Sequence, residues 1–243
     1  MNLFAEAFAW LVAPERWQGS YALPVLLGQH LFFTVVSVAI AFAIAAPAGW
    51  AIGHTGRGRE VAVAISGAAR ALPSFGLLIL LVLLFGVLQT PTAGFVTFVL
   101  LAIPPILAGA YTGIEAIDPR VRDAAKAMGM TPWQVFVKVE LPLGLPLVVG
   151  GLRSAVLQVI ATVTIGAWVN LGGLGWPIIQ GLPLRRFDQV LAGALLVALL
   201  ALLADLLFAL LQKAVVPLGV REAPRPRAER RSRARGAVRA GTT

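Results

Sequence analysis

Four long stretches of this chain carry no Asp, Glu, Lys or Arg, and they limit its fold more than any other feature. These stretches are residues 17–56, 71–114, 154–184 and 189–204. A helix that crosses the hydrocarbon core of a bilayer needs about 20 apolar residues. The 71–114 stretch is therefore long enough for two spans, with the turn between them expected at Gln89-Thr90-Pro91-Thr92.

Five membrane-spanning helices are predicted from these stretches and their apolar flanks. Their expected ranges are 25–52, 61–88, 93–114, 143–168 and 189–213. The second span should be broken, because Pro73-Ser74 and Gly76 interrupt it. The composition, 58% hydrophobic and 13% charged, excludes a soluble globular domain, for which about 45–50% and about 25% are usual. The expected fold class is all-α integral membrane, a polytopic helical bundle with about five core helices.

The amino-terminal residues 1–24 are predicted to form an interfacial segment. Phe4, Phe8, Trp10 and Leu11 have the spacing of a short helix that lies at a membrane surface. The alternative is a cleaved signal peptide, because Ala46-Pro47-Ala48 resembles a cleavage site. However, the apolar stretch before it is longer than the usual ~7–15 residues and no basic region opens the chain, so an uncleaved first span is expected.

The formal charge of +9 is concentrated at the carboxyl end, where residues 221–239 contain eight Arg and two Glu. Residues 217–243 are therefore predicted to be a disordered, Arg-rich tail on the cytoplasmic side, in contact with membrane lipid. No nucleic-acid partner is expected, since no basic patch is interleaved with aromatic residues.

The charges of the loops predict the same orientation. Basic residues follow the first, third and fifth predicted spans, so they lie on one side if five spans alternate. That side is expected to be cytoplasmic, which places the carboxyl terminus inside and the amino terminus outside. Arg185 and Arg186 in the last outer loop are exceptions, and a sixth span within residues 1–24 would place the amino terminus inside.

Residues 115–142 are the longest internal polar segment and are predicted to fold as two short helices. Each helix has signals for its ends: Asp118 with Pro119 and then Gly129 for the first, and Thr131 with Pro132 and then Leu141-Pro142 for the second. Apolar residues recur with helical spacing on both, as Val121, Ala124, Ala125 and Met128 and as Trp133, Phe136 and Val137. Such stripes favour docking into a groove of a soluble partner. The alternative is a solvated hairpin with no partner.

The same loop resembles the EAA motif, E-A-A-x3-G-x9-I-x-L-P, of permease subunits of binding-protein-dependent ABC importers. The matching residues are Asp123, Ala124, Ala125, Gly129, Val139, Leu141 and Pro142, with Asp for Glu and Val for Ile as the departures. The resemblance implies that residues 25–216 form a permease domain and that the motif residues couple it to a cytoplasmic ABC ATPase dimer. It also implies an extracytoplasmic substrate-binding protein, a second permease subunit (the same or homologous), and the bacterial cytoplasmic (inner) membrane.

Covalent chemistry is expected in a partner, not in this chain. The sequence has no G-x4-G-K-[ST] phosphate loop, so ATP and Mg would be used by the separate ATPase and this chain would bind no cofactor. No metal site is expected, because Cys is absent and His30 and His54 have no ligand spacing. A membrane enzyme is not expected either, since H-E-x2-H and paired intramembrane aspartates are lacking.

Further segments resemble the osmoprotectant branch of this importer family. They are RALPS at 70–74, YTGI at 111–114, Asp118-Pro119 and GGLG at 172–175, in that order. The resemblance implies ATP-driven import of a compatible solute such as glycine betaine, carnitine, choline or proline betaine. The alternatives are an importer for methionine or another small polar solute, and a secondary transporter.

Several residues near the span ends are candidates for the pore or substrate path, because they are polar, aromatic or helix-breaking: Arg70, Pro73, Ser74, Trp168, Asn170 and Trp176. Arg153 and Asp205 are charged residues within predicted spans, and each is expected to bond to another helix or, for Arg153, to lipid headgroups. Gly109 and Gly113 form a G-x3-G pair, for which close packing at a permease dimer interface is expected.

Overall fold

The computed structural model describes residues 2–216, except for the side chain of Arg70, and this part of the chain is α-helical with no β-strand. The helices are α1 (Leu3–Val12), α2 (Leu23–Thr55), α3 (Arg59–Ala71), α4 (Ser74–Phe85), α5 (Thr90–Glu115), α6 (Pro119–Ala127), α7 (Pro132–Val135), α8 (Leu141–Gly166), α9 (Trp176–Gly181) and α10 (Phe187–Ala214). A π-helical turn, η3 (Phe136–Glu140), joins α7 to α8. Single 3-10 turns lie at Pro14–Arg16, Val87–Gln89 and Ala167–Val169. The predicted tail, 217–243, lies outside the described residues.

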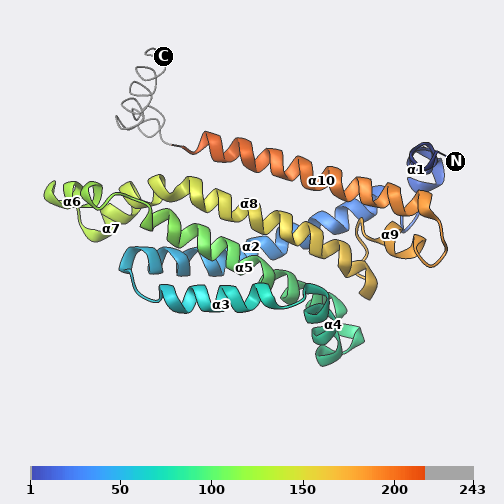
Figure 1. Ribbon diagram of the computed structural model, residues 1–243, viewed down its shortest axis with the longest axis horizontal. Helices are drawn as coiled ribbons and strands as arrows, with labels where there is room; N and C mark the ends of the chain where they lie inside the picture. The colour runs from blue at the N-terminus through green and yellow to red at the C-terminus, as the bar shows by residue number, and fades with distance from the viewer. Residues whose placement is uncertain (1, 217–243) are drawn as a thin grey trace, which may run out of the picture.

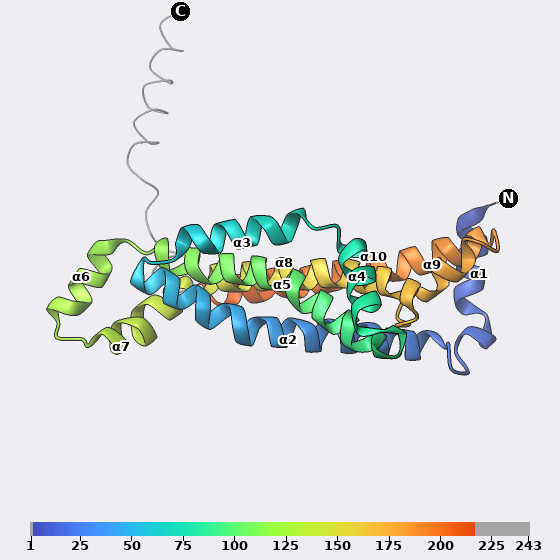
Figure 2. The ribbon, with the colours of Figure 1, turned by 90° about the horizontal axis from the view of Figure 1, so that it is seen from below.

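The long helices run side by side along the long axis of the molecule (Figure 1). At the centre α2, α5 and α8 pack against one another, while α10 lies along α8 and α3 lies along α5. The hairpin of α6 and α7 projects from one end of the bundle, and α1 and α9 lie at the opposite end (Figures 1 and 2).

Four helical segments are long and apolar enough to cross a membrane: Leu23–Thr55, Val87–Glu115, Pro132–Val169 and Phe187–Ala214. The α3–α4 pair is bent by 85° and would count as a fifth span. The bend falls at Pro73, which has no N–H to continue a helical hydrogen-bond ladder. The predicted all-α bundle of about five apolar spans is therefore confirmed, and the helix break expected at Pro73-Ser74 is present.

The second helix of the 115–142 loop does not end at Leu141-Pro142, so this prediction was wrong. Instead α7 continues through the π-helical turn directly into α8. The Leu141 N–H donates to the Phe136 carbonyl in the i→i+5 pattern of a π-helix. Pro142 then falls in the first turn of α8, where a missing N–H breaks no bond of that helix.

The backbones of α5 and α8 approach closely because glycines face each other at two levels. A Cβ atom on Gly109 would lie 2.7 Å from the carbonyl oxygen of Leu147, and one on Gly113 would lie 2.7 Å from that of Gly144. Small residues permit this approach, which in a bilayer is a main source of helix association. The Gly109/Gly113 pair therefore packs within the chain, and the expected role at a permease dimer interface was wrong.

The amino-terminal helix α1 lies across the end of the bundle and packs against α10 (Figure 2). Ala7 and Trp10 are buried together with Ala192 of α10, whereas Phe4 and Phe8 are exposed. Residues 1–24 thus contain the predicted short helix. An exposed aromatic face on a helix in this orientation suits a membrane surface.

Replacing Gly113 by Ala is expected to destabilise the bundle by about 1–3 kcal/mol, because the added methyl group overlaps the Gly144 backbone and pushes α5 from α8. Thermal unfolding of the detergent-purified protein measures the effect. The matched control is Gly28→Ala in α2, where no atom lies within 4 Å of the new Cβ. Equal melting temperatures for the two variants would contradict the close glycine packing.

Candidate functional site

The 115–142 loop folds as a capped helical hairpin, as its sequence predicts. The Asp118 carboxylate accepts a hydrogen bond from the Arg120 N–H at 2.9 Å and caps α6. At the start of α7, Thr131 and Gln134 form a reciprocal capping box. Helices this short are marginal alone, so these caps supply part of the order of the hairpin.

Gly129 turns the chain between α6 and α7. Its φ of +83° lies in the left-handed region, which glycine adopts at little cost. Its N–H donates to the Lys126 carbonyl, and the N–H of Met130 donates to the Ala125 carbonyl. These two hydrogen bonds define a Schellman C-cap, so the predicted end of the first helix is confirmed.

The apolar residues of the hairpin divide between its interior and its surface. Ala125 and Val135 are buried, whereas Val121, Met128 and Trp133 are exposed, the last two by 74% and 70%. We call these three exposed residues the hairpin surface. Apolar groups this exposed on a polar hairpin are typical of an interaction site. Docking of a partner here stays a prediction.

The residues of the EAA-like motif occupy two different parts of the hairpin. Asp123 and Ala124 are exposed and Ala125 is buried on α6, and Gly129 follows at the tip. The second half lies at the root: Val139 and Leu141 are half-buried on either side of Glu140, and Pro142 is exposed. The motif therefore combines an accessible tip with a root packed on the transmembrane bundle.

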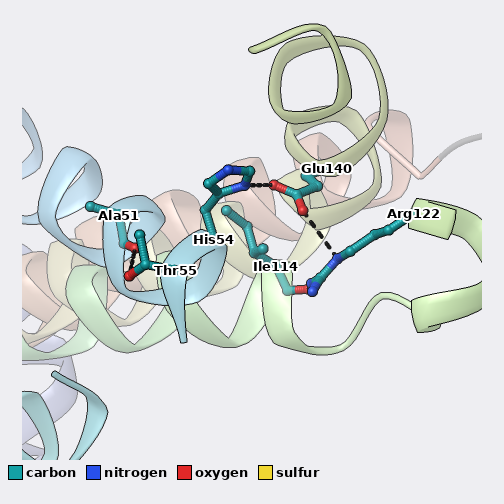
Figure 3. A network of polar contacts seen from close by, with 6 residues as sticks. All are labelled: Ala51, His54, Thr55, Ile114, Arg122 and Glu140. Atoms are coloured by element: carbon teal, nitrogen blue, oxygen red, sulfur yellow. Dashed lines mark hydrogen bonds and ion pairs between the residues drawn. The ribbon is translucent and has the colours of Figure 1, made fainter. Parts of the chain in front are cut away.

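A buried carboxylate, Glu140, joins this root to two other helices (Figure 3). Its side chain is only 2% exposed and lies between His54, at the end of α2, and Arg122 of α6. The Nδ1 of His54 is 2.6 Å from Oε2 of Glu140, and the Nε of Arg122 is 3.1 Å from Oε1. A buried carboxylate is stable only with such partners.

The Arg122 guanidinium also closes the end of α5. One of its terminal nitrogens donates to the Ile114 carbonyl, in the last turn of that helix (Figure 3). The final carbonyls of a helix have no partner within that helix. A cation at this position also interacts favourably with the negative end of the helix dipole. Arg122 is thereby fixed from two sides, by Glu140 and by α5.

Sequence reasoning did not select Glu140, His54 or Arg122. The available signal was Glu140 itself, a carboxylate between Val139 and Leu141 in an otherwise apolar helix start. Such a residue is rarely buried unless it is paired. The identity of its partners depends on how α2 and α6 are placed, which no local pattern encodes.

An apolar cavity of about 560 Å³ lies beside this network, between the end of α2 and α7. The Phe136 ring meets two side chains of α2 edge-on, with centroid distances of 6.3 Å to Trp50 and 5.8 Å to His54. Edge-to-face pairs at these distances are favourable. The root of the hairpin therefore contacts α2 by apolar packing as well as through Glu140.

Four of the six candidate pore residues lie in two separate parts of the structure. Pro73 and Ser74 form the α3–α4 break, and the ring of the next residue, Phe75, is 6.2 Å from that of exposed Trp168. Trp176, by contrast, stacks on Tyr21 with a centroid distance of 4.7 Å.

The two remaining candidates are Arg70 and Asn170. The side chain of Arg70 is not among those described. Asn170 has a left-handed backbone, with a φ of 62°, in the loop that leads to the glycines. A substrate path through any of the six candidates stays a prediction.

The 172–175 loop is fixed by two adjacent polar residues of α2, which sequence reasoning also missed. Gln29 accepts from the Gly173 N–H at 3.0 Å, and Nδ1 of buried His30 accepts from the Leu174 N–H at 3.2 Å. The His30 proton is then on Nε2, which lies 3.2 Å from the Ile160 carbonyl of α8. Gly172 has a left-handed φ of 73°, and a Cβ on it would lie 2.1 Å from the Gln29 oxygen, so a larger residue would displace the Gln29 side chain.

Arg153 of α8 and Asp205 of α10 pair with each other. The expectation that each bonds to another helix is therefore confirmed. The guanidinium donates two hydrogen bonds to the two carboxylate oxygens, at 2.6 and 2.7 Å. This bidentate geometry is the strong form of the pair. In the described part of the chain, these two charged side chains therefore serve to join α8 to α10.

A bundle of four or five apolar spans, with a capped polar hairpin between α5 and α8, is the architecture of a multi-pass membrane protein. The chain belongs to the family described as "Binding-protein-dependent transport system inner membrane component", which it matches over residues 42–217. It is a permease subunit of an ABC importer.

Curated relatives are similar over most of both chains. The osmoprotectant import permease protein OsmW of Salmonella typhimurium is 35% identical over 209 residues, which cover 82% of this chain and 94% of the relative. The glycine betaine/carnitine/choline transport system permease protein OpuCB of Bacillus subtilis is 30% identical, covering 79% and 88%. The choline transport system permease protein OpuBD of the same organism is 34% identical, covering 82% and 88%.

A solved structure has the same fold. The MetNI methionine ABC transporter, in an inward-facing conformation, superposes with a TM-score of 0.71 at 23% identity, covering 84% of this chain and 99% of that one. At this identity the likeness concerns the fold alone.

Asp205→Leu is expected to lower the melting temperature of the purified protein, because Arg153 is left without its carboxylate partner within the bundle. The double variant Arg153→Met with Asp205→Leu removes both charges and is expected to recover to within about 2 °C of the parent. If the double variant is as unstable as the single one, loss of packing rather than an unpaired charge causes the defect.

Proposed function

We propose that this permease subunit imports a quaternary-ammonium compatible solute, of the glycine betaine, carnitine, choline or proline betaine type. The observation that carries the proposal is the set of osmoprotectant permeases that are 30–35% identical to this chain over most of its length. The similarity to MetNI does not favour methionine, because it is a likeness of fold.

We propose further that the 115–142 hairpin is the coupling loop, which docks a cytoplasmic ABC ATPase dimer. Its exposed, apolar hairpin surface supports this role, as does the complete spacing of the motif residues. ATP and Mg are then used by the ATPase, a second permease subunit completes the translocation path, and a substrate-binding protein delivers the solute from the other side.

The distribution of basic residues supports a cytoplasmic location for the hairpin end of the bundle. Arg57 and Arg59 follow α2, several Arg and Lys residues lie on the hairpin, and Lys213 is in the last turn of α10. The ends of these elements lie together (Figure 1). By the positive-inside rule this end faces the cytoplasm, with the carboxyl terminus, and α1 and α9 face outward.

Gly129→Trp tests the coupling loop. The φ of +83° makes a bulky side chain strained at this turn, and the indole would cover the docking surface. The variant is expected to insert into the membrane but to lose at least about tenfold in ATPase co-purification and in ATP-driven uptake. Membrane insertion is checked by quantitative blotting of purified membranes.

The matched control is Gly19→Trp, which carries the same change at the opposite end of the bundle. Gly19 also has a left-handed φ, +90°, and no atom lies within 4 Å of its Cβ position. ATPase co-purification should be unchanged in this variant. Normal uptake by the Gly129→Trp variant would refute the coupling assignment.

The solute is tested by uptake of radiolabelled glycine betaine at high salt, in a host without osmoprotectant uptake of its own. The complete transporter is expected to restore accumulation, and excess unlabelled choline or carnitine to compete with it. Competition by methionine, with none by the quaternary ammonium compounds, would assign the other class of importer.

A further inference from the structure

The carboxylate of Glu140 is the point at which four helices of this chain are joined. It lies at the junction of the π-helical turn with α8, contacts His54 of α2, and pairs with Arg122 of α6, which in turn bonds to the end of α5 (Figure 3). We propose that Glu140 is a positioning residue for transport, which makes displacement of the coupling loop move α2 and α5 together with α8. The proposal rests on the proposed role of the loop in docking the ATPase.

One side of the hairpin is mechanically continuous with the bundle. Pro132–Val169 is a continuous helical segment, so a force on α7 reaches α8 without a flexible joint. The other side has no such continuity, because α6 is separated from α5 by the turn around Ala116 and Ile117. Apart from packing within the hairpin, α6 is joined to the bundle through Arg122, which contacts both the Ile114 carbonyl of α5 and Glu140.

Glu140 adds the links from the start of α8 to α2 and to α6, beside the bond from Arg122 to α5. Its carboxylate is 2% exposed, so water does not replace either partner. An ion pair withdrawn from water is screened little, and breaking it leaves an uncompensated buried charge. The contacts at 2.6 Å and 3.1 Å therefore hold α2 and α6 to the start of α8 in one arrangement.

The other ion pair at this end of the bundle is more exposed. Arg59 of α3 lies 3.7 Å from Glu115 at the end of α5, but the Arg59 side chain is 63% exposed. Exposed pairs at such distances contribute little and tolerate the loss of one partner. Of the two carboxylates in the described ion pairs at the hairpin end, Glu140 is the one whose side-chain position is fixed by burial.

The π-helical turn gives Glu140 its orientation. Residues 136–140 contain the extra residue of an i→i+5 turn, which rotates the next residues of the helix relative to a regular α-helix. Glu140 thereby faces inward toward His54 and Arg122 while its neighbours Val139 and Leu141 are half-buried. This is the physical role we assign to the position between Val139 and Leu141 in the motif.

Glu140→Gln tests the proposal in the full transporter, reconstituted in proteoliposomes with its ATPase and binding protein. The amide keeps the shape but lacks the charge that pairs with Arg122. Solute imported per ATP hydrolysed is expected to fall at least about tenfold, while ATPase co-purification stays within about twofold of the parent. The control is Arg59→Gln, which breaks the exposed Arg59–Glu115 pair at a residue outside the 115–142 hairpin, and its ratio should stay within about twofold of the parent.

The outcomes separate this proposal from the proposed function. If the parent protein itself shows no ATP-driven uptake, the proposed function fails. If the parent transports and Glu140→Gln has the parent's ratio of solute to ATP, the positioning role is overturned. It is also overturned if uptake and ATPase co-purification fall in proportion, because Glu140 then serves only the stability of the docking hairpin.

A second variant covers the case in which Glu140→Gln does not fold. Replacing Glu140 and both of its partners with apolar residues, as His54→Leu, Arg122→Met and Glu140→Leu, removes the buried carboxylate together with the groups that pair with it, and such replacements are commonly tolerated. We expect this variant to assemble with the ATPase and to remain uncoupled. A normal ratio of solute to ATP would show that packing alone transmits the movement, and would overturn the proposal.

Discussion

The close contact of α5 with α8 determines where every other part of this subunit lies. Gly109 and Gly113 on one helix meet the backbone of the other at Leu147 and Gly144, at distances that exclude any side chain. In a bilayer, an apolar helix face gains little free energy by moving from lipid to a protein contact. Close backbone packing at small residues therefore determines which helix faces meet. The 115–142 loop joins these same two helices, so their contact also brings the two ends of the loop together.

This arrangement explains why the loop projects as a compact hairpin with a buried root. Because α5 ends beside the start of α8, the Arg122 guanidinium reaches both the Ile114 carbonyl, to which it donates, and the Glu140 carboxylate, with which it forms an ion pair. His54 joins them since α2 also packs on both helices. The polar network thus depends on the glycine contact, and it converts a connection between two spans into an ordered part of the bundle.

Sequence patterns predict those features that depend on length and on neighbouring residues. The spans were located because a bilayer fixes how many apolar residues a helix needs, and the caps at Asp118, Gly129 and Thr131 because capping is a local hydrogen-bond pattern. The passage of the helix through Pro142 was missed, since a π-helical turn has no clear sequence signature. The partners of Glu140 and His30 were missed because they depend on the rotation of whole helices about their axes.

The contact between α10 and α8 depends on polar groups and not on facing glycine backbones. Its exposed leucines, among them Leu199, Leu203 and Leu207, are as stable in lipid as against protein, so they do not fix its orientation. Two contacts to α8 do: the Arg153–Asp205 pair, and a hydrogen bond from Gln212 to the Pro146 carbonyl at 3.0 Å. Because these polar groups would be costly to leave unpaired in hydrocarbon, they determine which face of α10 turns inward and leave the leucine face to the lipid.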